Sequence, residues 1–532
     1  MPIRMTDDQN DQRSSQRPSG GGGMRGGGGG GGILGALAPM LINLLIKKPK
    51  ILIVVLIVGA VFYFMSGSEG CAGGGGNVAS QVLQLATGAN FSPELYDKTE
   101  VFEPLADNVN SPLPEKVSLQ QFAPQRRNQG QQGSCVAWAS AYAARTIVQA
   151  QATEQAPDQA AFSPSYLYNQ IKIENSDCQG SYIQRALEYM KDGGVLPFSQ
   201  FAYTDEGCSK QPSAEEQQRA RQFRIKGFQR LSSTDAQDSP TDMLAMKQQL
   251  AQGSPVVIGM MVGGSFMQDM AGQEEWTPNT DDYNMRGFGG HAMCVIGYDD
   301  FKFGKLGGFQ LMNSWGPDWG KNGIAWMRYE DFAYFNKEAY AVYPQGKGVD
   351  VRPSTFNISF GLQLVDAKGI PTGEHIALRN TGGRTFRTEQ PVPKGTRFKV
   401  EVTNNSECYL YCFGEETDGS TYVLFPNTEK HSPYCGITGT RLFPSDQSMT
   451  IDDVGTTDVM AIIVYNQAVD FKKIDQALKA SSAKGLDGRL TATIGNELLD
   501  PASLKYTQGA TFGVSGPADR AAMAVVIEIE KR

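Results

Sequence analysis

One cysteine of this chain has the surroundings expected of a nucleophile. Cys135 follows Gly133 and Ser134 and begins a stretch, Cys135–Ala150, whose apolar pattern predicts a helix. At the first turn of a helix, backbone N–H groups and the helix dipole favour a thiolate. Gln129, six residues earlier, is placed to donate a side-chain N–H to a developing oxyanion, beside the backbone N–H of Cys135. A lone cysteine on a helix is more often a packed small residue, so this interpretation depends on partners elsewhere in the chain.

A base and an orienting group for this thiol follow in the sequence. The chain contains only three histidines, His291, His375 and His431. His291 begins a predicted strand, His291–Tyr298, and Asn313 ends another, Phe309–Asn313. An asparagine carbonyl can hold one imidazole nitrogen and fix the orientation of the ring. Together these residues predict covalent catalysis through a thiolate–imidazolium pair.

The segments around these residues resemble a known family. Residues 127–139, 289–298 and 311–323 are similar to the Cys, His and Asn boxes of the papain-like cysteine peptidases, in the same order and near the family's separation. The resemblance covers about residues 112–345. It implies a two-lobed fold, with Cys135 in a helical lobe and His291 and Asn313 in a β-barrel-like lobe. By the same resemblance, Gln129 is the oxyanion glutamine and Trp315 shields the His–Asn bond from water.

The resemblance also extends to substrate-binding positions. Cys178–Tyr182 is similar to the family's Cys-Asn-Gly-Gly loop, so Gly180 and Ser181 are expected to present backbone to an extended substrate. Gly133 and Ser134 allow a close approach of the substrate backbone, and Trp315 is placed among the substrate-binding residues. Tyr182 and Ala292 are expected to line the pocket for the side chain two residues before the cut.

Two departures from the family pattern bear on disulfides and regulation. The usual cysteine three residues before the nucleophile is Gln132 here, which leaves Cys178 free to pair with Cys208, where another family half-cystine falls. The family's long inhibitory pro-region with its charged helix is not recognisable. How activity is restrained is therefore open at this stage.

Charge and cysteine content exclude several other classes. The net charge is -8, and residues 1–50 carry seven Lys/Arg against three Asp, so the remaining 482 residues carry -12. Such an acidic body argues against a nucleic-acid partner. A zinc site built from Cys408, Cys412, His431 and Cys435 is disfavoured, because positions i and i+4 of a strand lie about 13 Å apart. We expect no metal and no cofactor; Cys435 either forms a disulfide with one of the other two cysteines or is a packed thiol.

The chain divides into five regions by composition. Residues 1–32 are Gly-rich and expected to be a disordered cytoplasmic tail. Residues 33–67 form a membrane-anchor region, with a single transmembrane helix at about 49–67. All cations of this part precede residue 51, so the N-terminus is expected in the cytoplasm and the rest outside, periplasmic in a bacterium. Residues 68–111 form a spacer with a short helix at Val78–Leu85; residues 112–346 form the catalytic domain, and residues 350–532 form a β-rich, sandwich-like domain.

The sequence thus predicts an α+β protein, a bacterial-type, membrane-anchored cysteine endopeptidase with a peptide or protein substrate. The C-terminal domain is expected to bind a protein or envelope partner. Two alternatives stay open. The same site with an amine acceptor would make the chain an amidase or transpeptidase, and a relic site would leave an anchored binding protein.

Overall fold

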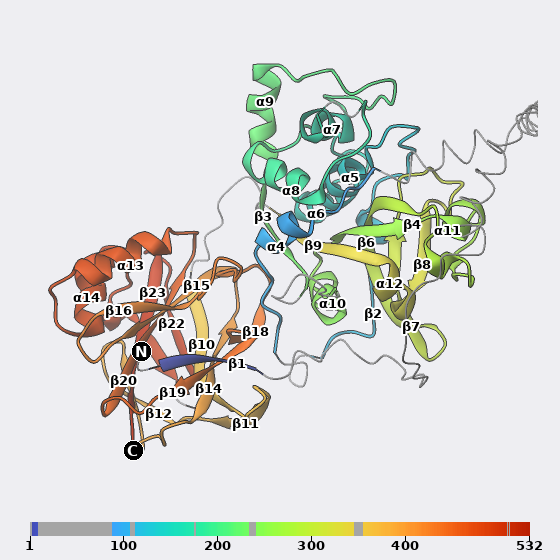
Figure 1. Ribbon diagram of the computed structural model, residues 1–532. Helices are drawn as coiled ribbons and strands as arrows, with labels where there is room; N and C mark the ends of the chain where they lie inside the picture. The colour runs from blue at the N-terminus through green and yellow to red at the C-terminus, as the bar shows by residue number, and fades with distance from the viewer. Residues whose placement is uncertain are drawn as a thin grey trace, which may run out of the picture. The chain divides into compact units, whose positions relative to one another are not determined.

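The computed structural model describes residues 3–8, 88–106, 112–174, 177–232, 241–344, 355–507, 509 and 511–532 (Figure 1). The predicted transmembrane helix, most of the Gly-rich tail and the predicted helix at Val78–Leu85 lie outside these residues. In the part of the chain that is described, no helix is long and apolar enough to cross a membrane.

The first part of the catalytic region is helical. The helix that carries the candidate nucleophile begins at Cys135 and runs without a break to Thr153, with a π-helical stretch in its middle. Ser163 caps a second helix by accepting the N–H of Tyr166, and Pro164 occupies its first turn, where the missing N–H costs nothing. The elements are α5 (Cys135–Ala137), the π-helical Trp138–Arg145, α6 (Thr146–Thr153), α7 (Pro164–Ile171), α8 (Ile183–Asp192) and α9 (Ala214–Ala220).

The second part of the catalytic region is a sheet. Its strands follow the order β3-β9-β4-β6-β7-β8-β5, with β2 beside β6, and all neighbours except β5 and β8 are antiparallel. The two strands predicted at His291–Tyr298 and Phe309–Asn313 coincide with β6 and β7. The bounds are β2 (Lys116–Ser118), β3 (Ile225–Arg230), β4 (Val256–Val262), β5 (Glu275–Trp276), β6 (Gly289–Phe303), β7 (Leu306–Met312), β8 (Ile324–Arg328) and β9 (Asn336–Pro344), with helices α10 (Met243–Ala251), α11 (Gly264–Gln268) and α12 (Tyr329–Phe335) around them.

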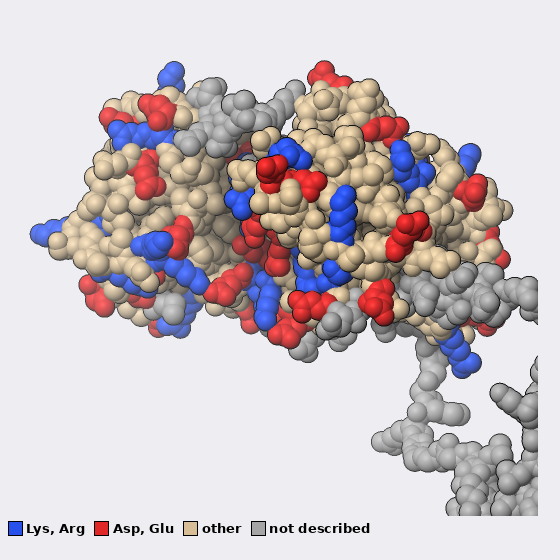
Figure 2. Space-filling model, turned by 90° about the horizontal axis from the view of Figure 1, so that it is seen from above, with Lys and Arg blue, Asp and Glu red and all other residues tan. Residues whose placement is uncertain are grey.

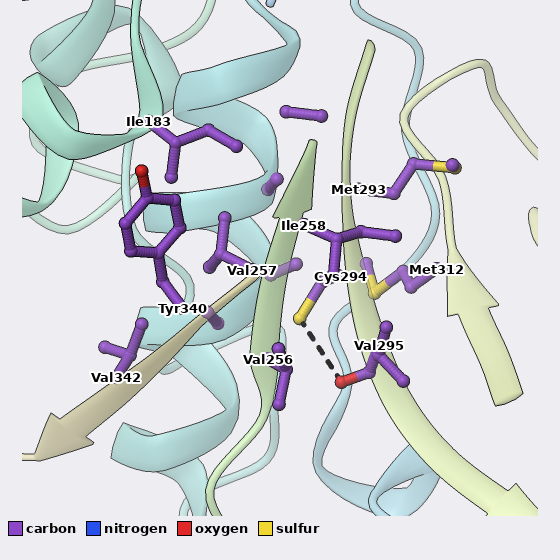
Figure 3. Packing of buried hydrophobic residues seen from close by; sticks show 14 of the residues in the cluster. Ile183, Val256, Val257, Ile258, Met293, Cys294, Val295, Met312, Tyr340 and Val342 are labelled. Carbon is purple, nitrogen blue, oxygen red and sulfur yellow. Dashed lines mark hydrogen bonds between the residues drawn. The ribbon is translucent and has the colours of Figure 1, made fainter. Parts of the chain in front are cut away.

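One apolar cluster joins the helical and the sheet part. Ile183 of α8 packs in the same cluster as Val257 of β4 and Cys294 of β6, and all three side chains are fully buried (Figure 3). β4 is buried along nearly its whole length, which explains its continuous apolar run. This shared core fixes the two lobes relative to each other, and therefore the residues at their junction.

The C-terminal region is β-rich, as predicted, and consists of two sheets around one core. The first has the order β1-β19-β14-β10-β22-β21, with β11 on β10 and β18 on β14; the second has the order β12-β13-β23-β20-β15-β16, with β17 on β15. The bounds are β10 (Thr355–Val365), β11 (Pro371–His375), β12 (Leu378–Gly382), β13 (Thr385–Thr388), β14 (Arg397–Asn404), β15 (Cys408–Glu415), β16 (Thr421–Phe425), β17 (Tyr434–Cys435), β18 (Gly439–Phe443), β19 (Gln447–Ile451), β20 (Thr457–Tyr465), β21 (Lys505–Thr507), β22 (Phe512–Pro517) and β23 (Ala522–Glu530).

Two helices that the sequence analysis did not predict cover the second sheet. α13 (Phe471–Ala480) and α14 (Gly485–Ile494) bury Ile474, Leu478 and Leu490 against residues of β15, β20 and β23. The spacing of Phe471, Ile474 and Leu478, together with the cap at Asp470, was a helical signal in the sequence.

The N-terminal residues differ from the expectation of a disordered tail. Residues 3–7 form β1 (Ile3–Asp7), which pairs antiparallel with β19. Ile3 is buried in the core of the C-terminal domain, and the carboxylate of Asp8 lies 2.6 Å from Lys399 Nζ and 2.7 Å from Arg397 Nη2. A single membrane crossing at 49–67 would put β1 and β19 on opposite sides of the bilayer, so this pairing requires an even number of crossings between them.

The charged surface is mixed in sign. On the face shown in Figure 2, Lys and Arg side chains are interspersed with Asp and Glu, and the blue side chains form no continuous stripe on that face.

Candidate active site

Cys135 lies where the helical lobe meets the sheet. It is the first residue of α5, its side chain is fully buried, and its Sγ accepts the backbone N–H of Ala292 at 3.4 Å. Ala292 follows His291 in β6, so this contact brings the thiol of one lobe beside the imidazole-bearing strand of the other.

His291 is held by the partner that its sequence position predicted. Its Nε2 lies 2.7 Å from Oδ1 of Asn313, which directly follows β7. An amide oxygen only accepts, so Nε2 carries the hydrogen and Nδ1 is left as the basic nitrogen. Nδ1 is buried and has no hydrogen-bond partner among the described residues. The ring of Trp315 stacks on the imidazole, with centroids 4.4 Å apart and planes 27° apart, beside the residue that the resemblance expects it to shield.

Gln129 is fixed by residues from both lobes. Its Oε1 accepts the Ser314 hydroxyl at 2.7 Å, and its backbone N–H donates to the Ser314 carbonyl at 2.8 Å. The Tyr203 hydroxyl donates to the Gln129 carbonyl at 2.7 Å. With Oε1 occupied, the amide Nε2 is the group directed to other acceptors, and it donates to the Gln132 carbonyl at 2.9 Å. Ser314 and Tyr203 were missed as site residues, although Ser314 lies within segment 311–323, one of those on which the resemblance rests.

The loop expected to bind substrate backbone packs tightly on the segment before the nucleophile. Gly133 N–H donates to the Cys178 carbonyl at 2.9 Å, and a methyl group on Gly133 would come within 2.7 Å of the Gln179 carbonyl carbon. Gly180 has a positive φ of 141° and lies in the same loop, and Tyr182 is half-buried at the start of α8.

Two further predicted residues have structural partners. The Ser134 hydroxyl lies 2.8 Å from the Tyr203 hydroxyl, which places it on the protein side of the cleft. The disulfide Cys178–Cys208 that the resemblance implied is present, with Cα atoms 5.9 Å apart. It closes the loop that carries Gly180 and Ser181.

A segment from the predicted spacer occupies the cleft over these groups. Ala89 N–H donates to the Gly290 carbonyl at 3.1 Å, and Asn90 N–H donates to the Ser181 carbonyl at 2.9 Å. In return Ser181 N–H donates to the Gly88 carbonyl at 3.0 Å, so Ala89 pairs with Ser181 as in a parallel sheet. The backbone groups of Ser181, expected to bind substrate, are thus already occupied by the chain itself.

The approach of this segment to the thiol is close. A methyl group on Gly88 would lie 2.7 Å from Cys135 Sγ, and one on Gly259 would lie 2.5 Å from Cε1 of Phe91. Phe91 therefore fills the space beside Gly259 and Ile183, next to Ala292 on β6. We name residues 88–106 the strap; after the cleft it forms α4 (Pro93–Lys98), which is capped by Ser92. The Gly88 carbonyl is bound by Ser181 and so is not offered to the oxyanion donors.

Burial of the site shifts the pKa values of both members of the pair. Burial raises the pKa of the Cys135 thiol to about 12, partly offset by the Ala292 N–H. Burial likewise lowers the pKa of His291 to about 4, against the opposing effect of the Asn313 hydrogen bond. Both shifts favour the neutral thiol and the neutral imidazole over the thiolate–imidazolium pair while the site is buried.

The remaining cysteine and histidine groups lie away from this site. Cys435 of β17 lies directly opposite Cys408 of β15, whereas Cys412 faces Phe425, and all three cysteines are thiols. His375 Nε2 lies 2.8 Å from Glu401 Oε2. In the described ranges, no group of three or more His, Cys, Asp or Glu side chains is arranged to hold a metal ion.

Comparison with known proteins agrees with this geometry. Residues 113–345 match the family model described as papain family cysteine protease. The chain carries a papain-family cysteine peptidase domain. Residues 392–466 match a domain of unknown function, DUF4384.

Individual relatives resemble the papain-family domain at low identity. An uncharacterized peptidase-like protein of Acanthamoeba polyphaga mimivirus is 28% identical over 208 residues, which are 38% of this chain and 64% of that protein. Cathepsin K of Mus musculus is 24% identical over 253 residues, 46% of this chain and 69% of that protein. Among solved structures, xylellain, a cysteine protease from Xylella fastidiosa, is 25% identical with a TM-score of 0.40 and covers 49% of this chain and 96% of its own.

Proposed function

We propose that this chain is a bacterial-type cysteine endopeptidase that hydrolyses peptide bonds in peptide or protein substrates. The observation that carries the proposal is the orientation of His291: Asn313 holds Nε2 at 2.7 Å and leaves Nδ1 unpartnered, while the adjacent Ala292 N–H binds the sulfur of Cys135. A nucleophile, a base with one free nitrogen and a group that orients the base are the parts that covalent hydrolysis requires.

The reaction follows from these positions. Nδ1 of His291 takes the proton of Cys135, and the thiolate attacks the peptide carbonyl. The side-chain N–H of Gln129 and the backbone N–H of Cys135 stabilise the oxyanion of the tetrahedral intermediate. The imidazolium protonates the leaving amine, and His291 then activates the water that hydrolyses the thioester and regenerates the thiol.

The contacts of the strap support the proposal that this structure is an inactive form of the enzyme, with the strap blocking the active site. It fills backbone positions of Ser181 and Gly290 that an extended substrate would need, and it keeps the pair neutral through burial. A substrate reaches Cys135 only after residues 88–91 have left the cleft.

A thiol-reactive epoxysuccinyl peptide tests the proposal in the full chain. The Gly88→Ala variant, in which the added methyl group conflicts with Cys135 Sγ, should be labelled, and the Gly88→Ala/Cys135→Ala double variant should not. Absence of labelling in folded Gly88→Ala protein would favour the relic, binding-protein alternative. A peptide substrate supplied together with a free amine distinguishes hydrolysis from the transpeptidase alternative. Exclusive formation of the exchanged amide would identify a transpeptidase.

We also propose that residues 33–67 attach the chain to a membrane, with the catalytic domain on the outer, periplasmic side. The support is the apolar composition of residues 33–46 and 51–65, and the lysines between them, Lys47, Lys48 and Lys50, which favour the cytoplasmic side. Because β1 pairs with β19, residues 3–8 belong on the same side as the C-terminal domain. Deletion of 33–67 should move the protein from the membrane to the soluble fraction; retention in the membrane fraction would contradict the proposal.

A further inference from the structure

The second half of the strap lies on the C-terminal domain, and its acidic side chains recur at every third position. Asp97, Glu100 and Glu103 each contact a residue of the short segment 430–432. Lys430 Nζ lies 2.8 Å from Asp97 Oδ1, the Ser432 hydroxyl donates to Glu100 Oε2 at 2.6 Å, and His431 Nδ1 lies 2.7 Å from Glu103 Oε1.

Backbone hydrogen bonds join the same two segments. Val101 N–H donates to the Lys430 carbonyl at 2.7 Å, and Ala106 N–H donates to the Thr440 carbonyl at 2.8 Å. Arg441 Nε donates to the Glu103 carbonyl at 3.0 Å. Main-chain hydrogen bonds of this kind give affinity for an extended peptide. The spacing of the three acidic side chains fixes which strap residue lies opposite which residue of segment 430–432.

The contact is buried as well as polar. Val101 and Phe102 are each 2% exposed and Glu103 is 1% exposed. A buried carboxylate needs partners for its lone pairs, and Glu103 has His431 on one oxygen and the N–H of Ser445 on the other. Removing the partners of such a buried group lowers the free energy of unfolding far more than removing an exposed ion pair does.

The strap also touches the catalytic domain between these contacts. Phe102 N–H donates to the Arg230 carbonyl at 3.0 Å, and Arg230 Nε donates to the Thr99 carbonyl at 3.1 Å. Residues 99–106 are therefore bound from both sides, although they lie outside both family matches, 113–345 and 392–466.

We propose that the C-terminal domain is the receptor for the strap, and that by binding residues 97–106 it keeps residues 88–91 over Cys135. This inference rests on the proposed peptidase function. Only residues 92–96 separate the bound half from the blocking half, so binding of the one holds the other beside the cleft at high effective concentration. Loss of the C-terminal contacts frees the strap to leave.

The rate at which an epoxysuccinyl peptide labels Cys135 in the full chain measures the opening of the cleft. Glu103→Gln removes the buried charge while keeping its shape, and should accelerate labelling at least tenfold. Lys430→Ala removes a half-exposed ion pair without risk to the core, and should accelerate it about twofold to fivefold. Lys472→Ala is the matched control, since it removes an exposed ion pair with Glu429 in the same domain and not one of the ion pairs between the strap and residues 430–432; its rate should stay that of the parent.

A double-mutant cycle guards against general destabilisation. If Lys430 acts through Asp97, the Asp97→Ala/Lys430→Ala double variant should be labelled no faster than the faster of the two single variants. If the two changes act independently, their effects on the labelling rate should multiply. Parent-like rates in Glu103→Gln and Lys430→Ala, with fast labelling in Gly88→Ala, would overturn the receptor role and leave the peptidase intact. Absence of labelling in Gly88→Ala as well would overturn the peptidase, and the receptor role with it.

Discussion

The Cα of Gly88 lies so close to the sulfur of Cys135 that a methyl group added there would be 2.7 Å from Sγ. A separation under 3 Å is far inside van der Waals contact, and the next two neighbours of that methyl group would be the backbone carbon and oxygen of Gly133, each at 3.0 Å. The absence of a side chain at one position thus allows the strap to seal the nucleophile.

Gly88→Ala should therefore displace the start of the strap and expose the thiol. We expect labelling of Cys135 to be at least tenfold faster than in the parent, with little change in thermal stability of the domain core. Glu94→Ala, an exposed change in α4 of the same strap, is the control and should leave the rate unaltered. Measurable and equal labelling rates in the two variants would contradict the sealing role of Gly88.

Opening the cleft should also change the ionisation of the catalytic pair. Burial raises the pKa of Cys135 to about 12 and lowers that of His291 to about 4, and both shifts favour the neutral forms. In the open form, contact with solvent and the proton-accepting Nδ1 of His291 should lower the pKa of Cys135 and raise that of His291. The ultraviolet absorbance of the thiolate, taken as the difference from a Cys135→Ala background, should be missing from the parent at neutral pH and present in Gly88→Ala. A thiolate signal in the closed parent at neutral pH would refute this assignment.

Ser314 should act on catalysis through Gln129. Its hydroxyl occupies Oε1 of the glutamine at 2.7 Å and so directs the amide N–H away from it. In the Gly88→Ala background, Gln129→Ala should lower kcat about 100- to 1,000-fold, the usual loss of one oxyanion donor. Ser314→Ala should lower kcat by a smaller factor, about 5- to 20-fold, because the amide keeps other contacts. The double variant should be no worse than Gln129→Ala; a multiplied loss would show that Ser314 acts independently.

The positions of the candidate catalytic residues could be predicted because each combines a residue type with a local element. Cys135 at a helix start, His291 at a strand start and Asn313 at a strand end needed only the local pattern and their order. The resemblance supplied what the pattern did not, namely that these three ends meet at one junction and that Cys178 pairs with Cys208.

The strap was not predictable in this way. Residues 88–106 lack a regular spacing of apolar residues that would predict a buried element. Their burial comes from two partners that lie far away in the chain, at Ser181 and at Lys430–Ser432. β1 was missed for the same reason, since Ile3 gains its environment only from β19. Both segments were predicted to be tail or spacer from their composition, which carries no information on contacts with residues far away in the chain.

The contact between His431 and Glu103 should make opening of the cleft depend on pH. Burial by itself lowers the pKa of His431, but the hydrogen bond and charge of Glu103, with a further contribution from Asp446, outweigh burial and the opposing charge of Lys430, so the pKa is raised. A raised histidine pKa contributes stability below the unfolded value and loses it as pH rises through the folded value. The strap should thus be held most firmly in mild acid and released progressively on the alkaline side.

The labelling rate of the parent divided by that of Gly88→Ala isolates this effect, because both proteins react through the same open site and the ratio reports only the opening step. We expect the ratio to rise with pH above about 6.5, the usual histidine value. In His431→Gln the imidazole no longer titrates, so the ratio should start higher and stay flat. Since Glu103 keeps its Ser445 N–H in that variant, the buried carboxylate is not left without any donor. A rise of the same size in His431→Gln would assign the pH dependence to a different group.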